Sequence, residues 1–275
     1  MLKIVRSVEG KQNRRHVVRL DDDQHIECVV YRRDTLCVST QVGCAVGCPF
    51  CASGANGLSR NLVLEELIAQ VRAATDAGAE LKRVTLSGIG EPLHNPHTLE
   101  FMRWCRADGL LPSVTTSGGP TRRLPELLAS HHNGVTVSVH AGTEQVRARL
   151  VPKGPSLAEL FSTLERTLPT ISNNRRKKIA LSYLVIEGQN DTDAELDAFL
   201  ERAVPLGQSL HLFAYNSVPT SDMRPVPRPR YEAIYARAAA TGLRVHMSST
   251  ARIEDNGGCG TLVALRTSQG VAGTP

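Results

Sequence analysis

The sequence predicts an α/β protein that forms a partial (β/α)6 barrel with a short N-terminal β-hairpin extension. After the first 35 residues, short runs rich in β-branched residues alternate with helical segments, a pattern that is typical of a parallel sheet. The length of 275 residues is close to that of a single (β/α) barrel. We therefore expect the extension over residues 1–35 and the barrel over residues 36–275.

The hairpin is predicted by two strand-like runs, HVVRL and HIECVVY, which flank a polar turn at residues 21–24. The barrel strands are expected in TLCVST, LKRVTLSG, LLPSVTTSG, GVTVSVHA, KKIALSYLVIEG, SLHLFAYN and LRVHMSS. Helices are expected to begin near Leu64 and to cover residues 97–107, 122–130, 192–203 and 231–240. The proline-rich stretch VPTSDMRPVPRPR is expected to be a surface loop over the barrel mouth, where such folds place their active sites.

Composition and charge narrow the class of protein. No stretch approaches the ~20 apolar residues of a membrane span, and the basic N-terminus has no apolar signal segment, so we expect a cytoplasmic protein without a membrane partner. The net charge of +5 permits a polyanionic partner without requiring one. Seven cysteines, three of them in one short loop, favour metal or redox chemistry in a reducing compartment over a disulfide framework.

The cysteine-rich loop, QVGCAVGCPFC, places Cys44, Cys48 and Cys51 in CxxxCxxC spacing between a strand and a helix. Three thiolates can hold three irons of a [4Fe-4S] cluster and leave the fourth iron open to chelate S-adenosylmethionine (SAM). Gly43 and Gly47 are expected to allow the positive φ angles that a compact loop requires. The loop therefore predicts a radical SAM enzyme.

A zinc site is the alternative interpretation of this loop. Zinc sites of the ribbon type bring a second CxxC or CxxH pair to complete four ligands. No such pair follows at the usual spacing in this sequence, so we favour the iron–sulfur cluster.

The segment SGIGEPL follows the next strand, where bare glycines let the backbone approach a cofactor and Glu91 can accept a hydrogen bond from the methionine amino group. Together these segments resemble the RlmN/Cfr family of radical SAM methyltransferases, which methylate an adenine ring carbon of large-subunit ribosomal RNA. The matched stretches keep the family's order over residues 25–266: TLCVSTQVGCAVGCPFC, SGIGEPLHN, VTTSG, VTVSVHA, LVPKG, LVIEGQND, AYNSV and GGCGTL.

The resemblance implies a set of SAM contacts in this chain. Gly90 and Glu91 would meet the methionine amino group, and Ser117 would meet its carboxylate end. The remaining implied contacts, on the ribose and adenine, are Ser138, Val139, His140 and Asn216. From the residues alone, the serine and histidine could equally be satisfied polar groups of the core, and the asparagine could cap a turn.

Two further cysteines match the family's methyl-transfer pair. Electron-poor adenine carbons do not attack the SAM methyl group, so in the family one cysteine is methylated first and a 5′-deoxyadenosyl radical then activates that methyl group. The resemblance assigns this role to Cys259 in NGGCGTLV and the resolving role to Cys37 in TLCVST. The resolving step ends in a disulfide, which a flavodoxin-type or other low-potential reductant would reduce. From the residues alone, a lone strand cysteine such as Cys37 is a buried packing residue.

Three other residues receive weaker assignments. Glu27 aligns with the family's hairpin carboxylate that accepts a proton, although without the alignment it would be interpreted as an exposed strand carboxylate. Cys28 and Cys105 match no family role and are expected to be packing residues.

The substrate is the point at which the sequence departs from the family. The family's enzymes carry a helical accessory domain before the hairpin, whereas here the match begins at residue 25, so we expect a short, monomeric form without that domain. Basic residues at 175–178 and 224–230 could contact RNA phosphates or form a solvated face. Adenine in ribosomal or transfer RNA is the favoured substrate. The alternatives are a small molecule or nucleotide of a biosynthetic pathway, and a non-catalytic RNA-binding protein.

Overall fold

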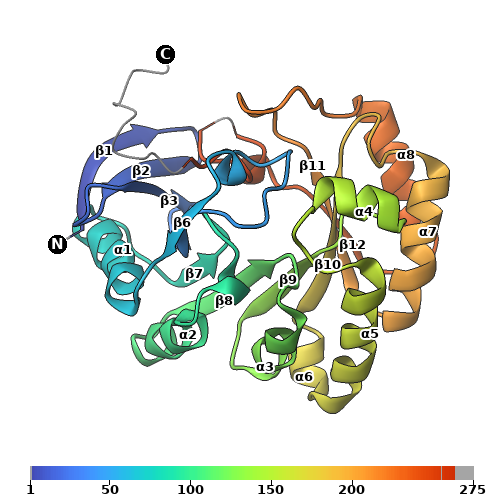
Figure 1. The fold of residues 1–275 in the computed structure, drawn as a ribbon, viewed down its shortest axis with the longest axis horizontal. Coiled ribbons are helices and arrows are strands. Elements are labelled where there is room, and N and C mark those ends of the chain that lie inside the picture. Colours follow the sequence, from blue (N-terminus) through green and yellow to red (C-terminus); the bar gives the residue numbers. More distant parts are fainter. Residues whose placement is uncertain (1, 255, 264–275) are drawn as a thin grey trace.

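The structure is a computed structural model that describes residues 2–254 and 256–263 (Figure 1). One sheet runs in the order β1-β2-β3-β4-β7-β8-β9-β10-β11-β12, and all neighbours from β4 to β12 are parallel. Its strands are β1 (Lys3–Glu9), β2 (Asn13–Arg19), β3 (His25–Tyr31), β4 (Thr35–Val38), β7 (Arg83–Leu86), β8 (Leu111–Thr116), β9 (Gly134–Ser138), β10 (Ile179–Val185), β11 (Ser209–Ala214) and β12 (Val245–Met247). The predicted partial barrel is confirmed.

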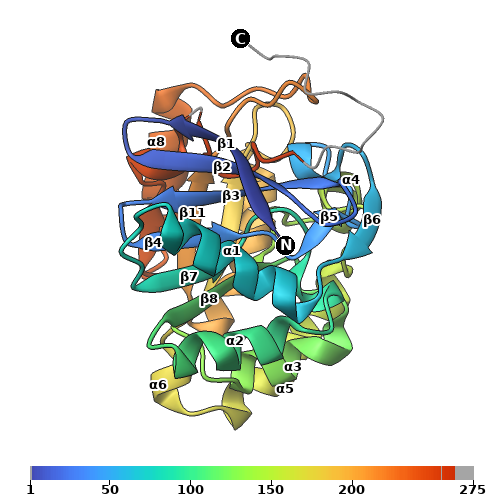
Figure 2. The same cartoon turned by 90° about the vertical axis from the view of Figure 1, so that its left-hand side faces the viewer.

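Helices cover the outer face of the parallel strands, as Figures 1 and 2 show. They are α1 (Leu64–Asp76), α2 (Thr98–Ala107), α3 (Leu124–Ala129), α4 (Glu144–Leu150), α5 (Leu157–Thr167), α6 (Asn173–Arg176), α7 (Asp193–Ala203) and α8 (Arg228–Ala239). No helix is expected from the sequence between β9 and β10, where the structure has three, α4 to α6. The signal for α5 was present, because Ser156 caps its first turn and its apolar residues recur at helical spacing.

The N-terminal extension contains one strand more than the sequence predicts. The expected hairpin is β2 and β3, which pair antiparallel, and β1 adds a third antiparallel strand at the edge. Strand β3 pairs in turn with β4, so the extension continues the barrel sheet. The apolar residues of β1, in KIVRSVE, do not alternate regularly with polar ones, so the sequence does not predict this strand.

A small second sheet closes the base of the cysteine-rich loop. It pairs β5 (Gln41–Gly43) with β6 (Leu58–Asn61), two short strands that the sequence did not predict. Gly43 and Gly47 both have positive φ, 78° and 68°, as expected. At Gly43 a Cβ would lie 1.8 Å from the carbonyl oxygen of Gly57, so the hairpin excludes any larger residue there.

The core lies between the sheet and its helices. Leu67, Val71 and Ala74 of α1 recur at helical spacing and are buried against it. The Glu66 side chain accepts a hydrogen bond from the backbone N–H of Val63 at 3.0 Å and fixes the start of that helix. Among the described residues, no helix has the length and apolar character needed to cross a membrane.

Residues 251–254 and 256–263, which we call the C-terminal loop, close the open side of the barrel against the first two strands. The Glu254 carboxylate accepts hydrogen bonds from the backbone N–H groups of Lys11 (2.6 Å) and Gln12 (3.0 Å), in the turn between β1 and β2. The side-chain amide of Asn13 donates to the carbonyl of Ala251 at 2.8 Å. These hydrogen bonds therefore attach the C-terminal loop to the N-terminal extension.

We expect Glu254→Ala to loosen the C-terminal loop, because two backbone donors lose a charged acceptor. The loss should destabilise the docked loop by about 2 kcal/mol and speed amide hydrogen exchange at residues 256–263, measured by mass spectrometry. Glu232→Ala is the control, since it removes only an exposed partner of Arg228. Unchanged exchange at residues 256–263 in Glu254→Ala would show that other contacts hold the loop.

Candidate functional site

Cys44, Cys48 and Cys51 line one cavity of about 150 Å³, which we call the cluster cavity. Burial raises the pKa of Cys44 to about 12 and also raises the pKa of Cys48 and Cys51. Five of the predicted SAM contacts line the same cavity: Gly90, Glu91, Ser117, Ser138 and His140. The structure therefore brings residues from three strand ends, those of β7, β8 and β9, to the cysteine-rich loop.

The three thiols fit an iron–sulfur cluster better than a single zinc ion. Among the described residues, no group of three or more His, Cys, Asp or Glu side chains is arranged to hold one metal ion. A single zinc ion requires all of its ligand atoms around one metal centre, whereas in a cubane each thiolate coordinates a different iron. Val46 and Phe50 give the loop an apolar surrounding in which buried protonated thiols would exchange their protons for iron.

Glu91 is a buried carboxylate with a complete set of protein donors. It is 4% exposed, and it accepts hydrogen bonds from the backbone N–H and hydroxyl of Ser117 (both 2.7 Å), the hydroxyl of Thr116, and the N–H of Leu93 (3.1 Å). In this conformation Glu91 and Ser117 thus satisfy each other. Gly90 beside them has φ of 107°, and a Cβ there would lie 2.7 Å from a side chain of β5.

His140 is held as a neutral ring at the edge of the cluster cavity. Its Nδ1 accepts a hydrogen bond from the N–H of Leu184 at 3.0 Å, so the neutral ring carries its proton on Nε2. Burial and, to a smaller extent, the nearby guanidinium of Arg147 lower the pKa of His140 to about 3. Ser138 lies beside it on the cavity wall, whereas the Val139 side chain is fully buried and not among the lining residues.

Arg147 of α4 holds the strand ends that form this wall. It is 1% exposed and donates to the carbonyls of Ser138 (2.7 Å), Val139 (2.8 Å), Ser117 (2.8 Å) and Pro155 (3.1 Å). Burial lowers the pKa of Arg147 to about 10. The sequence did not identify this residue, because an arginine in a short amphipathic helix is usually solvent-exposed.

A second cavity of about 140 Å³, the mouth cavity, adjoins the first and shares Ser138 and His140 with it. Asn216 lines the mouth cavity, and its side-chain amide donates to the carbonyls of Arg252 (2.7 Å) and Cys259 (2.9 Å). The predicted ribose contact is therefore also an anchor of the C-terminal loop.

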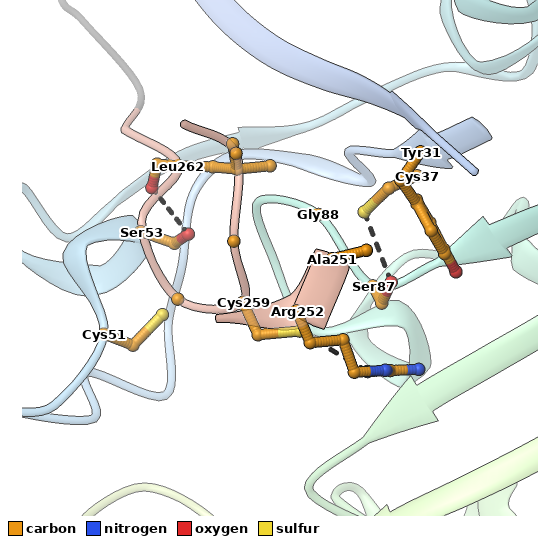
Figure 3. A pocket seen from close by; sticks show the side chains of 13 residues that line it. Tyr31, Cys37, Cys51, Ser53, Ser87, Gly88, Ala251, Arg252, Cys259 and Leu262 are labelled. Carbon is orange, nitrogen blue, oxygen red and sulfur yellow. Dashed lines mark hydrogen bonds between the residues drawn. The ribbon is translucent and has the colours of Figure 1, made fainter. Parts of the chain in front are cut away.

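Cys37 and Cys259, far apart in the sequence, line a third cavity of about 60 Å³ (Figure 3). The Cys37 sulfur lies 3.2 Å from the hydroxyl of Ser87, and burial raises the pKa of Cys37 to about 11. Cys259 is exposed, and its sulfur accepts a hydrogen bond from Arg252 at 3.4 Å. Both sulfurs are free thiols, so the disulfide expected at the end of turnover is not formed in this state.

Cys51 and Ser87 line all three cavities. The loop at residues 44–51, which we call the cluster loop, the predicted SAM contacts and the cysteine pair therefore lie around adjoining cavities. The C-terminal loop also contacts the cluster loop directly, because the hydroxyl of Ser53 donates to the carbonyl of Leu262 at 2.8 Å. A group bound on the cluster loop would therefore lie close to the cysteine pair.

The glycines around Cys259 give the loop its shape. Gly257 and Gly260 have positive φ, 77° and 83°. At Gly258 a Cβ would lie 2.4 Å from the carbonyl oxygen of Glu254. These glycines therefore allow a close-packed turn around Cys259.

Glu27 lies on β3 and is buried, 7% exposed, contrary to its appearance in the sequence as an exposed carboxylate. It accepts a hydrogen bond from the N–H of Val263 at 2.9 Å and pairs with Arg15 at 3.4 Å. Burial raises the pKa of Glu27, against the opposing effect of Arg15. A raised pKa suits a proton acceptor, but Glu27 is not among the residues that line the three cavities.

The two basic segments lie at different ends of the barrel. Residues 175–178 surround the end of α6 and precede β10, so they lie at the amino end of the strands, away from the site (Figures 1 and 2). The second segment follows β11 at the site end, where Arg224 is exposed while Arg228 and Arg230 pair with carboxylates. Only the second segment is placed to meet a substrate at the mouth.

Cys28 and Cys105 are fully buried in the core, which confirms that they are packing residues. Arg252, in contrast, is a site residue that the sequence did not reveal. It lies five residues before the matched GGCGTL, in a stretch without a recognisable motif, and only the fold brings its side chain to the cysteine pair.

Known proteins with similar sequences are radical SAM proteins and probable RNA methyltransferases. Residues 38–200 match the Radical SAM superfamily. A "Probable RNA methyltransferase" of Bordetella avium is 34% identical, and the match covers 94% of this chain and 74% of that protein. A protein of the same name from Aromatoleum aromaticum is 33% identical over 97% of this chain and 76% of its own length.

Solved structures with a similar fold include a radical SAM methyltransferase and a protein bound to S-adenosylmethionine. A radical SAM methyltransferase from Sphaerobacter thermophilus has a TM-score of 0.84 and 30% identity, over 95% of this chain and 81% of that chain. SuiB of Streptococcus suis, solved with S-adenosylmethionine, has a TM-score of 0.60 at 14% identity, over 78% of this chain and 50% of that one, and is similar in fold.

We expect anaerobically reconstituted protein to bind about four irons and four sulfides per chain, because three thiolates suit a cubane with one open iron. Alanine at Cys44, Cys48 or Cys51 should abolish this binding in iron and sulfide assays. Cys105→Ala is the control, since its thiol lies in the core. Stoichiometric zinc without iron in protein purified under strict anaerobiosis would contradict the cluster.

We also expect Glu91→Gln to weaken SAM binding, because an amide nitrogen would face the donors of Ser117. The SAM-dependent increase in melting temperature of the cluster-loaded protein should shrink, which corresponds to about 2 kcal/mol of lost binding free energy. Glu100→Gln, on the exposed face of α2, is the matched control. An unchanged increase for Glu91→Gln would remove this residue from the cofactor site.

Proposed function

This chain belongs to the Radical SAM superfamily, whose members use a [4Fe-4S] cluster and SAM, and on this premise we propose that it methylates RNA through Cys259. The acceptor we propose is an sp2 ring carbon of adenine. The names of the relatives from Bordetella avium and Aromatoleum aromaticum support RNA as the substrate class.

One observation carries the chemical part of this proposal. Cys37 and Cys259 line the same cavity, and Cys51 of the cluster loop lines it too. A radical SAM enzyme that only removes hydrogen from its substrate has no use for two free thiols beside the cluster loop. Two thiols suit a reaction in which one sulfur carries a carbon and the other releases it.

The bound cluster and SAM would supply the methyl group and the one-electron chemistry. Cys259, exposed at the cavity edge, would carry the methyl carbon to the substrate. The Cys37 sulfur would then attack the Cys259 sulfur, so that a disulfide forms, the bond from sulfur to carbon breaks, and the carbon keeps the electron pair and takes a proton. Glu27 would accept the proton lost from the ring carbon, and the one unpaired electron of the adduct would pass to the oxidised cluster before the sulfurs join. A low-potential reductant would then return two electrons to the disulfide.

An RNA base would enter from the carboxyl end of the strands, where the mouth cavity lies. Phe50, Phe213 and Tyr215 line that cavity and offer aromatic faces for a base removed from its stack. Arg224 is exposed at the same end and is placed to meet phosphates. The basic residues at 175–178 lie at the other end and have no part in this proposal.

We expect protein expressed with methyl-labelled methionine to carry the label on Cys259, detected by peptide mass spectrometry. Cys259→Ala should lose both the label and methyl transfer to RNA, whereas Cys105→Ala should keep both. Absence of the label from wild-type protein that contains its cluster would refute the methyl-carrying role.

Cys37→Ala extends the same test to the substrate. If Cys37 resolves the adduct, its loss should leave a methylene bridge between Cys259 and the substrate, and the trapped species identifies the substrate as RNA or as a small molecule. Full turnover by Cys37→Ala, with no adduct, would leave Cys37 as a packing residue of β4.

A further inference from the structure

Arg252, at the end of a short 3-10 helix (Thr250–Arg252), places its guanidinium in the cavity shared by Cys37 and Cys259. Its Nη1 donates a hydrogen bond to the Cys259 sulfur at 3.4 Å, and Figure 3 shows the two side chains running alongside each other. No role follows for this arginine from the methyl-transfer scheme above.

Both the side chain and the backbone of Arg252 are held by further contacts. Its carbon lies 4.9 Å from the centre of the Phe213 ring, within the range of a cation–π contact. The Arg252 carbonyl accepts hydrogen bonds from the N–H of Cys259 (3.0 Å) and from the side chain of Asn216 (2.7 Å). Arg252 and Cys259 are thus bonded to each other through both backbone and side chain.

The side chain of Arg252 bonds to a sulfur, whereas surface arginines of this protein pair with carboxylates. Arg237, for example, pairs with the carboxylates of Asp193 and Asp197. Within the described part of the chain, no carboxylate lies within ion-pair distance of Arg252, and the Cys259 thiol is the group that raises the pKa of Arg252 most. A half-buried guanidinium whose nearest partner among the described residues is a sulfur is suited to stabilise the negative charge that this sulfur carries when it reacts.

We propose that Arg252 is a positioning residue: the hydrogen bond from its Nη1 holds the Cys259 sulfur in the cavity it shares with Cys37 and stabilises negative charge on that sulfur when it reacts. This inference rests on the proposed function, because it gives the methyl-carrying cysteine its orientation and nucleophilicity. When a thiolate attacks a carbon, the sulfur–carbon bond forms, the leaving group departs with its electron pair, and the proton has already passed to solvent. A fixed cation beside the sulfur favours that form before the attack.

A phosphate of the substrate is the other anion that an arginine of this kind would bind. The geometry favours the thiol, because the Nη1 donor is already directed at the Cys259 sulfur and the Phe213 ring covers the guanidinium. The two roles predict different effects of removing the charge. Loss of a thiol partner changes Cys259 in the absence of RNA, whereas loss of a phosphate contact does not.

The test is the rate at which iodoacetamide alkylates Cys259, followed by peptide mass spectrometry at fixed pH under anaerobic conditions. The protein is purified without its cluster and reconstituted with iron and sulfide in the absence of SAM and RNA, so that Cys259 is still an unmethylated thiol. Arg252→Met keeps the apolar stem on Phe213 and removes the charge. It should slow the alkylation about tenfold, the size expected for losing a hydrogen bond to a charged group. Arg252→Lys should recover the rate to within about threefold of wild type, because it restores a cation without the planar donor geometry.

Arg237→Met is the matched control, since it removes an arginine whose partners are exposed carboxylates on α7. It should leave the alkylation rate unchanged, and equal iron content and melting temperature in all variants would exclude a general loss of structure. An unchanged rate in Arg252→Met, or a higher KM for RNA as its only defect, would overturn the proposal. Because alkylation requires no methyl transfer, a slowed rate together with an unmethylated Cys259 in wild type would refute the proposed function and leave this inference standing.

Discussion

The carboxylate of Glu254 binds two backbone N–H groups of the turn between β1 and β2, and this contact joins the last described loop to the first strands. A parallel sheet that does not close on itself leaves one side open, and here the C-terminal loop covers that side. Cys37 arrives on β4 and Cys259 on the loop, so they share a cavity only while the loop is docked. The cysteine pair is therefore a consequence of tertiary structure, with no local sequence element that could assemble it alone.

Two buried charges hold the cofactor side of the site, and neither pairs with the other. Glu91 takes its hydrogen bonds from hydroxyl and backbone groups, while Arg147 gives its own to four backbone carbonyls. Burying each charge is costly unless every partner is present, so both side chains enforce one arrangement of the strand ends. Ser117 links the two side chains, because its N–H and hydroxyl donate hydrogen bonds to Glu91 and its carbonyl accepts one from Arg147.

The sequence predicted those parts of the fold and site that depend on short-range patterns. Alternating strands and helices gave the barrel, and the CxxxCxxC spacing gave the three cysteines of the cluster cavity. Arg147 and Arg252 escaped notice because an arginine is usually exposed, and only long-range folding shows that these two point inward. The burial of Glu27 escaped for the same reason, since the loop that covers it lies more than two hundred residues further along the chain.

The two sulfurs of the pair differ in exposure, and the difference suits their proposed order of action. Cys259 is exposed and held by a cation, so it can meet both a methyl donor and a bulky substrate. Cys37 is half-buried beside Ser87, and burial raises its pKa to about 11, so it stays protonated and unreactive at neutral pH while the other sulfur is loaded. A resolving thiol that reacted early would form the disulfide before the carbon had been transferred. In the proposed reaction, burial of Cys37 on its strand would protect the first half, in which Cys259 is methylated. The second half would require the Cys37 proton to leave once the adduct lies in the same cavity.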